Sequence, residues 1–216
     1  MVTGGNRGIG LSIARKFEAL GDVVVVTSRS GDPITGLNVV QCDVTSTESI
    51  EAAFTTIEEK FGPVEVAIAN AGITKDKLLV RMADEDIEDV INTNLFGAIR
   101  VARRAARQMT QARNGRIIFI SSVVALMGSA GQVNYAASKS GLVGAARSLA
   151  REIGSRGVTI NVVAPGFIDT DMTAVLSEER KTQIVNNIPL GRYGSAAEVA
   201  DAVAFLASPG ATYITG

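Results

Sequence analysis

The chain has 216 residues, of which 46% are hydrophobic and 20% are charged, and its formal net charge is −1. This composition is typical of one globular domain and gives no overall reason to expect a nucleic acid or a membrane surface as partner. The chain has no histidine, which excludes a Ser-His-Asp triad, a Cys-His pair and histidine-ligated zinc, so we expect no metal. Any acid or base must be a carboxylate, a tyrosine, a lysine or part of a cofactor.

Cysteine content and hydropathy bear on location. The only cysteine is Cys42, so no internal disulfide can form, which is typical of a reducing compartment. The sequence has neither an apolar run of about 18 residues nor a charged-then-apolar leader. We therefore expect a cytoplasmic protein.

A glycine-rich loop, "TGGNRGIG" (Thr3–Gly10), opens the chain and precedes an amphipathic helix at Leu11–Leu20. Glycine allows a tight turn and a close approach to a pyrophosphate, which can then rest on the amides of the helix N-terminus. The spacing is G-x-x-x-G-x-G and differs from the common G-x-G-x-x-G dinucleotide motif. A tight turn without a ligand is the alternative.

Short β-branched runs alternate with helical patterns along the rest of the chain. The runs that we expect to be buried strands are Val23–Thr27, Val64–Ala69, Arg116–Ser121 and Val158–Val163. Helices with capping boxes are predicted to start at "TSTE" (Thr45–Glu48) and "SAAE" (Ser195–Glu198). This alternation predicts one α/β domain over residues 1–216, with a parallel sheet covered on both faces. Both ends of the chain look truncated relative to such a fold.

The end of the second predicted strand bears on the choice of cofactor. Proteins that bind NAD usually carry an acid at this place, about 20 residues past the glycine loop. Here the sequence is "TSRS", with Arg29, and the first carboxylate is Asp32. Arg7 in the glycine loop could reach the same region. Two guanidinium groups suit a phosphate monoester, so we expect NADP(H) as cofactor; a solvated loop arginine is the alternative.

Unusual residues follow four further strands: Cys42–Val44, Asn70–Gly72, Ser121 with Ser122, and Pro165 with Gly166. Each group could be simple turn chemistry. Ligands of open α/β sheets, however, bind beyond the carboxyl ends of the strands. The convergence of all four groups on that edge therefore predicts a binding site.

Tyr135 and Lys139 are four residues apart in "NYAASKSG", within a predicted helix at Val133–Glu152. Residues at i and i+4 share a helix face. A free phenol has a pKa near 10, and we expect the ammonium and the positive ring of an oxidised nicotinamide to lower it. Tyr135 could then donate a proton to a carbonyl oxygen. A core tyrosine beside a solvated lysine is the alternative.

This constellation resembles the short-chain dehydrogenase/reductase family. "TGGNRGIG", "NAG", Ser122 thirteen residues before Tyr135, "YAASK" and "PG" occur in that family's order and spacing over essentially the whole chain. Within the family, the stretches "NAGITKDKLLVRM", "NVVAPGFIDTDMT" and "IPLGRYG" make it most similar to the 3-oxoacyl-[acyl-carrier-protein] reductases of bacterial fatty-acid synthesis, including their actinobacterial branch.

The resemblance implies a Rossmann-type doubly wound sheet with strand order 3-2-1-4-5-6, without the family's usual seventh strand, and a homotetramer. It implies reduction of a 3-oxoacyl thioester on acyl carrier protein by NADPH. Tyr135 would be the acid, Lys139 would hold the nicotinamide ribose and depress the tyrosine pKa, and Ser122 would bind the substrate oxygen. Asn94 would hold a water of a proton relay, and Ser121 is the rival for the serine role.

The cofactor residues follow from the loop, the strand ends and the same resemblance. With Tyr135 and Lys139, the expected set is Gly4, Asn6, Arg7, Gly8, Ile9, Gly10, Arg29, Asp43, Val44, Asn70, Ala71, Gly72, Pro165, Gly166, Ile168 and Thr170. Asp43 and Val44 match the family's adenine contacts. Ile168 and Thr170 match positions near the carboxamide and the pyrophosphate.

Charge is distributed unevenly. Between Leu95 and Arg151 there are nine cations and no Asp or Glu. This region could attract an acidic carrier protein. The family resemblance points to the rim of the site, with Arg113 and Arg156 as candidates; the alternative is a subunit interface, where this helix usually lies in the family. Val175–Asn187 is expected to form a lid.

Other functions remain open from the sequence. The same catalytic residues would serve a reductase of acetoacetyl-CoA, a sugar or a xenobiotic carbonyl. A non-catalytic NADP-binding sensor is the alternative from another class.

Overall fold

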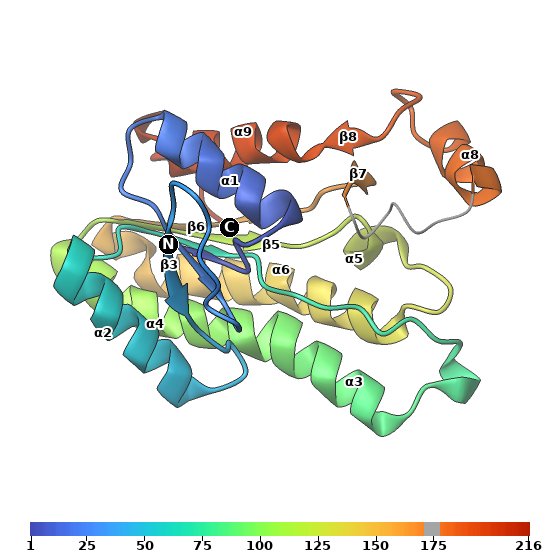
Figure 1. Cartoon of the computed structure of the whole chain (residues 1–216), viewed down its shortest axis with the longest axis horizontal. Coiled ribbons are helices and arrows are strands. Elements are labelled where there is room, and N and C mark those ends of the chain that lie inside the picture. Colours follow the sequence, from blue (N-terminus) through green and yellow to red (C-terminus); the bar gives the residue numbers. More distant parts are fainter. Residues whose placement is uncertain (171–177) are drawn as a thin grey trace.

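A computed structural model of the chain describes residues 1–170 and 178–216 and has an α/β architecture (Figure 1). Six parallel strands form the main sheet in the order β3-β2-β1-β4-β5-β6, which confirms the predicted strand order. The strands are β1 (Val2–Thr3), β2 (Val25–Ser28), β3 (Asn38–Gln41), β4 (Val66–Ala69), β5 (Gly115–Ile120) and β6 (Val158–Val163). In the described part of the chain, no seventh strand joins this sheet.

Helices cover both faces of the sheet, as a parallel sheet requires. In Figure 1, α1 (Gly8–Ala19) and α9 (Ala196–Ala207) lie above the sheet, and α2 (Thr47–Phe61), α4 (Gly97–Ala112) and α6 (Val133–Ile153) lie below it. The shorter elements are η1 (Leu79–Arg81), α3 (Asp84–Ile91), the π-helical turn η2 (Asn92–Phe96), α5 (Val124–Met127), η3 (Gly154–Arg156), α8 (Glu178–Asn186) and η4 (Pro209–Ala211).

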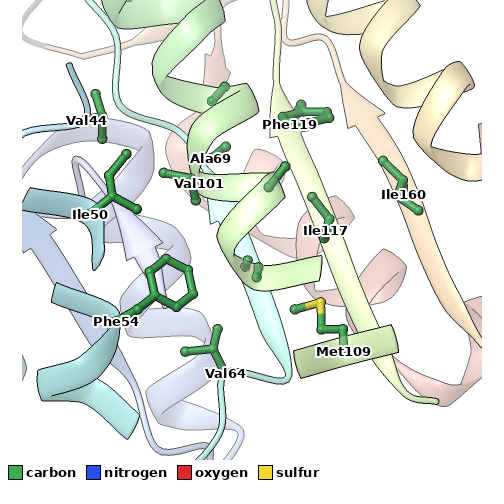
Figure 2. Packing of buried hydrophobic residues seen from close by; sticks show 14 of the residues in the cluster. Val44, Ile50, Phe54, Val64, Ala69, Val101, Met109, Ile117, Phe119 and Ile160 are labelled. Atoms are coloured by element: carbon green, nitrogen blue, oxygen red, sulfur yellow. The ribbon is translucent and has the colours of Figure 1, made fainter. Parts of the chain in front are cut away.

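Each face of the sheet has its own hydrophobic core. Below the sheet, one cluster joins the helices to the strands: Phe54 of α2 lies near Val64, and Met109 of α4 lies near Ile117 of β5 (Figure 2). Above it, α1 and α9 pack on the alternate residues of the same strands, such as Ile118. Because consecutive strand residues are buried on opposite faces, the strands read as continuous apolar runs in the sequence.

Two local predictions need comment. The capping box at Ser195 is confirmed, because Ser195 Oγ accepts from Glu198 N at 3.2 Å and Glu198 accepts from Ser195 N at 2.8 Å. The one at Thr45 is wrong by one residue: Ser46 caps α2 by accepting from Ser49 N at 3.1 Å. Thr45 is not free for this role, since its hydroxyl donates to Asp43 at 2.7 Å.

Two features at the carboxyl side of the fold were not predicted. A second, two-stranded sheet joins β7 (Ile168–Asp169) to β8 (Gly194–Ser195). At the edge of the main sheet, Gly216 N donates to Ile160 O at 2.8 Å, so the last residues lie along β6. None of the described helices combines the length and apolarity needed to cross a membrane.

Candidate active site

Tyr135 and Lys139 lie one turn apart near the start of α6, as the predicted helix requires, and both face the carboxyl end of β5. Lys139 is buried, with 4% of its surface exposed, and its Nζ donates to Ile120 O, the last residue of β5, at 2.8 Å. The same Nζ lies 5.7 Å from the centre of the Tyr135 ring. The alternative of a solvated lysine beside a core tyrosine therefore does not hold.

The two candidate serines have different surroundings. Ser121 is buried and its hydroxyl donates to Lys139 O at 2.8 Å, so it fixes α6 against β5. Ser122 is only partly buried, and its side chain lies near enough to Tyr135 to lower the pKa of the phenol. Ser122 Oγ also accepts from Val124 N at 3.2 Å, which holds it at the start of α5. Of the two, Ser122 is the one whose hydroxyl meets Tyr135.

The pKa of Tyr135 departs from the expectation. Burial of the phenol raises its pKa above the ordinary value of 10.0, the nearby Ser122 hydroxyl lowers it, and the charge of Asp76 raises it further. The expected lowering of this pKa was for a phenol beside Lys139 and an oxidised nicotinamide; in the protein without cofactor the pKa is raised instead. The physical reason is that desolvation of the ionised phenol dominates.

Burial acts on Lys139 as well. Loss of hydration disfavours the ammonium and lowers the pKa of Lys139 from 10.5 to about 8. Near neutral pH the lysine is therefore still charged but close to its titration range. The Lys139 ammonium can therefore donate hydrogen bonds to neutral hydroxyl groups at neutral pH.

Asn94 sits at the back of this site, in the π-helical turn η2. Its Nδ2 donates to Ile73 O at 3.0 Å and to Ser138 Oγ at 3.1 Å, and its Oδ1 accepts from Ile73 N at 2.8 Å. A β-carbon on Gly72 would lie 3.2 Å from Asn94 Oδ1 and 3.5 Å from Lys139 Nζ. The glycine therefore keeps open a gap between the amide oxygen and the amine.

The glycine loop and "NAG" pack against each other at the carboxyl ends of β1 and β4. Gly4 has a φ of +61°, and a β-carbon there would lie 2.9 Å from Ala71 Cα. A β-carbon on Gly10 would lie 2.4 Å from Asn70 Nδ2, which donates to Thr3 O and Gly4 O. The loop can thus form only with glycine at these places.

The N-terminus of α1 offers the donor set that a pyrophosphate needs. Its N-cap residue, Arg7, makes no capping hydrogen bond with its side chain, and the first turn of α1 contains no acidic residue. By contrast, Ser46 and Ser195 cap α2 and α9. Exposed helix amides with an adjacent arginine favour an anion. These residues fit the diphosphate of a dinucleotide.

The far end of the candidate cofactor site lies at β2 and β3. Arg29 and Asp43 line a hollow of about 560 Å3 at this place, and the Arg29 charge helps to hold the pKa of Asp43 below its usual value, after the larger effect of hydrogen bonding from Thr45. Val44, which matches one of the family's adenine contacts, has a buried side chain that is 6% exposed and packs in the core against the start of α4. Its backbone is the part that can meet a ligand.

The loop after β6 closes the other side. Val123 N donates to Pro165 O at 2.8 Å, which ties the "PG" turn to the start of α5. Thr170 lies beside the glycine loop, with its Cγ2 3.8 Å from the position of a β-carbon on Gly8. These two segments also carry four other expected cofactor residues: Asn6, Ile9, Gly166 and Ile168.

The expected lid spans Val175–Asn187. Its first part, Val175–Ser177, falls outside the described residues, and most of the rest forms α8.

Three supporting residues were missed from the sequence. Thr3 Oγ1 accepts from Asn70 N at 3.0 Å and Ala71 N at 3.1 Å. Asn134, which is 1% exposed, donates to Lys75 O and Asp86 O, both at 3.1 Å. Ser138 receives the bond from Asn94. The sequence offered one signal for Asn134 and Ser138, since each is a small polar residue directly before a motif residue, Tyr135 or Lys139.

Part of the positive charge of α4 is neutralised by acidic residues of α2. Arg104 pairs with Glu58 through its two Nη atoms, at 2.9 and 2.7 Å, and with Glu51 through Nε, at 2.7 Å. Arg107 also pairs with Glu51, at 3.0 Å. This pairing within the chain accounts for part of the uneven charge.

Arg113 and Arg156 do not lie at the rim of the site. Arg113 Nη2 donates to Ser155 O at 3.1 Å, so the two arginines are neighbours, but they directly precede β5 and β6. The chain therefore places them at the amino edge of the sheet, whereas the site is at the carboxyl edge. The expectation was wrong because a helix between parallel strands ends where the next strand begins.

Comparison with known proteins agrees with the site that the structure shows. Residues 4–216 match the model of a family described as Enoyl-(Acyl carrier protein) reductase. The chain is 53% identical over its whole length to the 3-oxoacyl-[acyl-carrier-protein] reductase MabA of Mycobacterium avium, covering 85% of that protein, and equally identical to MabA of Mycobacterium tuberculosis, covering 87%. It is 48% identical to the 3-oxoacyl-[acyl-carrier-protein] reductase FabG of Escherichia coli, covering 92% of it.

Proposed function

The chain belongs to the short-chain dehydrogenase/reductase family, and from this premise we propose that it reduces 3-oxoacyl thioesters carried on acyl carrier protein to 3-hydroxyacyl thioesters. The observation that carries the proposal is the meeting of Ser122, Tyr135 and Lys139 at the carboxyl end of β5. Identity of about half the residues over the whole length supports the same substrate class.

Tyr135 and Ser122 share the work at the substrate oxygen. The bound nicotinamide supplies hydride to the carbonyl carbon. The raised pKa of Tyr135 keeps its hydroxyl protonated at neutral pH, so it can donate a proton to the carbonyl oxygen as that oxygen gains charge. The Ser122 hydroxyl donates a hydrogen bond to the same oxygen and stabilises the charge.

Lys139 and Asn94 act behind the tyrosine. Lys139 holds the ribose hydroxyls of the nicotinamide half, since its amine is buried close to the Tyr135 ring. We propose that a water bridges Lys139 Nζ and Asn94 Oδ1, two groups that both lie close to Gly72. Through that water, a proton can return to Tyr135 after each turnover.

We propose NADP(H) as the cofactor. Arg29 lines the hollow at the adenosine end, and Arg7, in the glycine loop, is exposed. At the end of β2, where NAD-binding proteins usually carry an acid, this chain has Arg29. Arg29→Ala should weaken NADPH binding at least tenfold while NADH binding changes less than twofold. Equal losses with both cofactors would refute the phosphate assignment.

A second reaction has one observation in its favour, namely the description of the matching family as enoyl reductases. Reduction of a C=C bond requires a proton at carbon, whereas the paired hydroxyls of Ser122 and Tyr135 suit an oxygen. Following NADPH absorbance with a 3-oxoacyl-, then a 2-enoyl-acyl-carrier-protein substrate separates the two. Oxidation with the enoyl substrate alone would overturn the proposal.

The same assay separates the remaining alternatives. Equal kcat/KM for acetoacetyl-CoA, a sugar or a xenobiotic carbonyl would indicate a reductase of another substrate. No oxidation with any carbonyl, together with NADPH binding, would indicate a sensor. If the acidic carrier is steered by charge, its kcat/KM should fall more steeply with salt than that of acetoacetyl-CoA. Similar salt dependence for both would contradict steering.

We also propose a homotetramer in the cytoplasm. Support for self-association is a hollow of about 500 Å3 between α4 and α6, lined by Ile99, Ala106, Leu149 and Ile153 among others. Support for the location is the free, buried Cys42. Light scattering after size exclusion tests the assembly, and a monomeric mass would refute it.

A further inference from the structure

Gln41 connects the edge of the sheet to the cofactor arginine. It is the last residue of β3, the edge strand, and is in register with Ser28 at the end of β2. Its side chain Nε2 donates to the backbone carbonyl of Arg29 at 2.8 Å. The Gln41 side chain is exposed, so no core residues packed around it hold it in this position.

The turn that carries Arg29 is held from both sides. Ser28 Oγ accepts from Gly31 N at 3.1 Å, which closes the turn over the end of β2. Gly31 has a φ of +70°, and a β-carbon there would lie 3.1 Å from Gln41 Cβ. The turn therefore rests directly on Gln41, with Arg29 between its two attachments.

The guanidinium that this turn carries needs a fixed direction. Arg29, Gln41 and Asp43 line the same hollow. An arginine binds a phosphate best through two parallel hydrogen bonds, a geometry that a rotation of its backbone would break. Release of the Arg29 carbonyl would allow such a rotation, because the residue itself is exposed.

We propose that Gln41 is a positioning residue for cofactor selectivity: by holding the Arg29 carbonyl it aims the guanidinium at the 2′-phosphate of the dinucleotide. This inference rests on the proposed use of NADP(H) and adds a residue outside the glycine loop and the strand-end motifs. Gln41 acts through Arg29 and makes no contribution of its own to the phosphate charge.

Asn38 provides a matched control on the same strand. It is the first residue of β3, is also exposed, and its Nδ2 donates to Val24 O at 3.0 Å. The two amides thus attach the two ends of β3 to the chain around β2. Only the bond of Gln41 reaches the arginine turn.

The experiment measures dissociation constants of NADPH and NADH by fluorescence titration for the full chain and for Gln41→Met and Asn38→Leu. Both replacements keep approximate size and remove the donor. Gln41→Met should raise the Kd of NADPH about fivefold, the loss expected for one hydrogen bond, and that of NADH less than twofold. Asn38→Leu should leave the ratio of the two constants unchanged. Adenosine 2′,5′-bisphosphate and AMP should repeat the pattern.

The variant Arg29→Ala tests whether Gln41 acts through Arg29. Adding Gln41→Met to Arg29→Ala should cause no further loss of NADPH affinity, because the residue acts through the arginine. An additive loss, equal losses for NADPH and NADH, or an unchanged NADPH constant would overturn the inference. If Arg29→Ala weakens NADPH selectively while Gln41→Met does not, only the role of Gln41 fails. If Arg29→Ala weakens NADPH and NADH equally, both the NADP(H) assignment and the role of Gln41 fail.

Discussion

The amine of Lys139 lies 5.7 Å from the centre of the Tyr135 ring and donates its hydrogen bond to the carbonyl of Ile120, at 2.8 Å. Both groups are shielded from water, and both respond by favouring their neutral forms: the pKa of the phenol rises and that of the amine falls to about 8. The pair is thus a protonated acid beside a readily titrated cation. A protonated Tyr135 is suited to donate a proton to a carbonyl. The opposite pKa shifts lead to a separate prediction for each residue.

Tyr135→Phe should abolish turnover while the protein still binds cofactor. The change removes the hydroxyl that meets Ser122 and leaves the ring in place. We expect kcat to fall at least about a thousandfold, within the range for loss of a general acid, and the Kd of NADPH to change less than about threefold. Single-turnover absorbance and fluorescence titration measure the two quantities. Near-normal turnover would show that another group supplies the proton.

Lys139→Met should increase the stability of the cofactor-free protein at pH 7. The folded-state pKa of Lys139 is about 8, against 10.5 when solvated, so the folded state binds the proton less well than the unfolded state. The unfolded state therefore carries more protons between these values, and the stability of the wild-type protein rises with pH across that window. Below about pH 8 the full cost of the buried charge is present.

The gain should be on the order of 1–2 kcal/mol at pH 7, after allowing for the lost hydrogen bond to Ile120 O. It should shrink as the pH rises from 8 towards 10.5. Urea unfolding of both proteins at pH 7 and pH 10 measures the difference. A variant that is less stable at pH 7, or a difference that does not depend on pH, would contradict the assigned desolvation.

Ser122→Ala and Ser121→Ala should separate chemistry from structure. Ser122→Ala removes the hydroxyl beside Tyr135, and we expect kcat to fall about 100- to 1000-fold with little change in stability. Ser121→Ala removes one of the donors to the buried Lys139 O, which also accepts the backbone bond of α6, and should cost about 0.5–1.5 kcal/mol of stability, with kcat reduced only severalfold. Exchanged phenotypes would reverse the two roles.

Local patterns in the sequence were enough to predict a parallel sheet and the helix that carries Tyr135 and Lys139, whereas the strand order came from the family resemblance. The strand runs are apolar on both faces, and the helix from Val133 places Tyr135 and Lys139 on one side by periodicity alone. The sign of the Tyr135 pKa shift could not be predicted in this way. It depends on how much water the fold removes from the phenol, which only the packed structure determines.

Long-range contacts account for the other differences. Gln41 belongs to no motif, and Thr3 is the one residue of the glycine-rich motif whose role its type did not indicate. Their importance comes from partners brought close by the sheet: Arg29 for the first, Asn70 and Ala71 for the second. The positions of Arg113 and Arg156 relative to the site were mistaken because charge was read without the direction of the strands. Direction follows from strand and helix order, so this information was present in the sequence.

Gly72→Ala should impair catalysis through Asn94 and Lys139 without unfolding the protein. The new β-carbon would lie 3.2 Å from Asn94 Oδ1 and 3.5 Å from Lys139 Nζ, and would fill the gap that the proposed water needs. Gly72 does not have a positive φ, so the backbone tolerates alanine. We expect kcat to fall about 10- to 100-fold, since small displacements of catalytic groups are costly, and the melting temperature to change little.

Gly144→Ala is the control for that substitution. Gly144 lies on the same helix as Lys139, and a β-carbon there meets no described atom within 4 Å. It should leave kcat unchanged and stabilise the helix by about 0.5–1 kcal/mol, because alanine has the higher helix propensity. Normal activity of Gly72→Ala beside a normal control would mean that proton return to Tyr135 does not pass between Asn94 and Lys139. Loss of activity in both variants would instead point to a general effect of added side chains around α6.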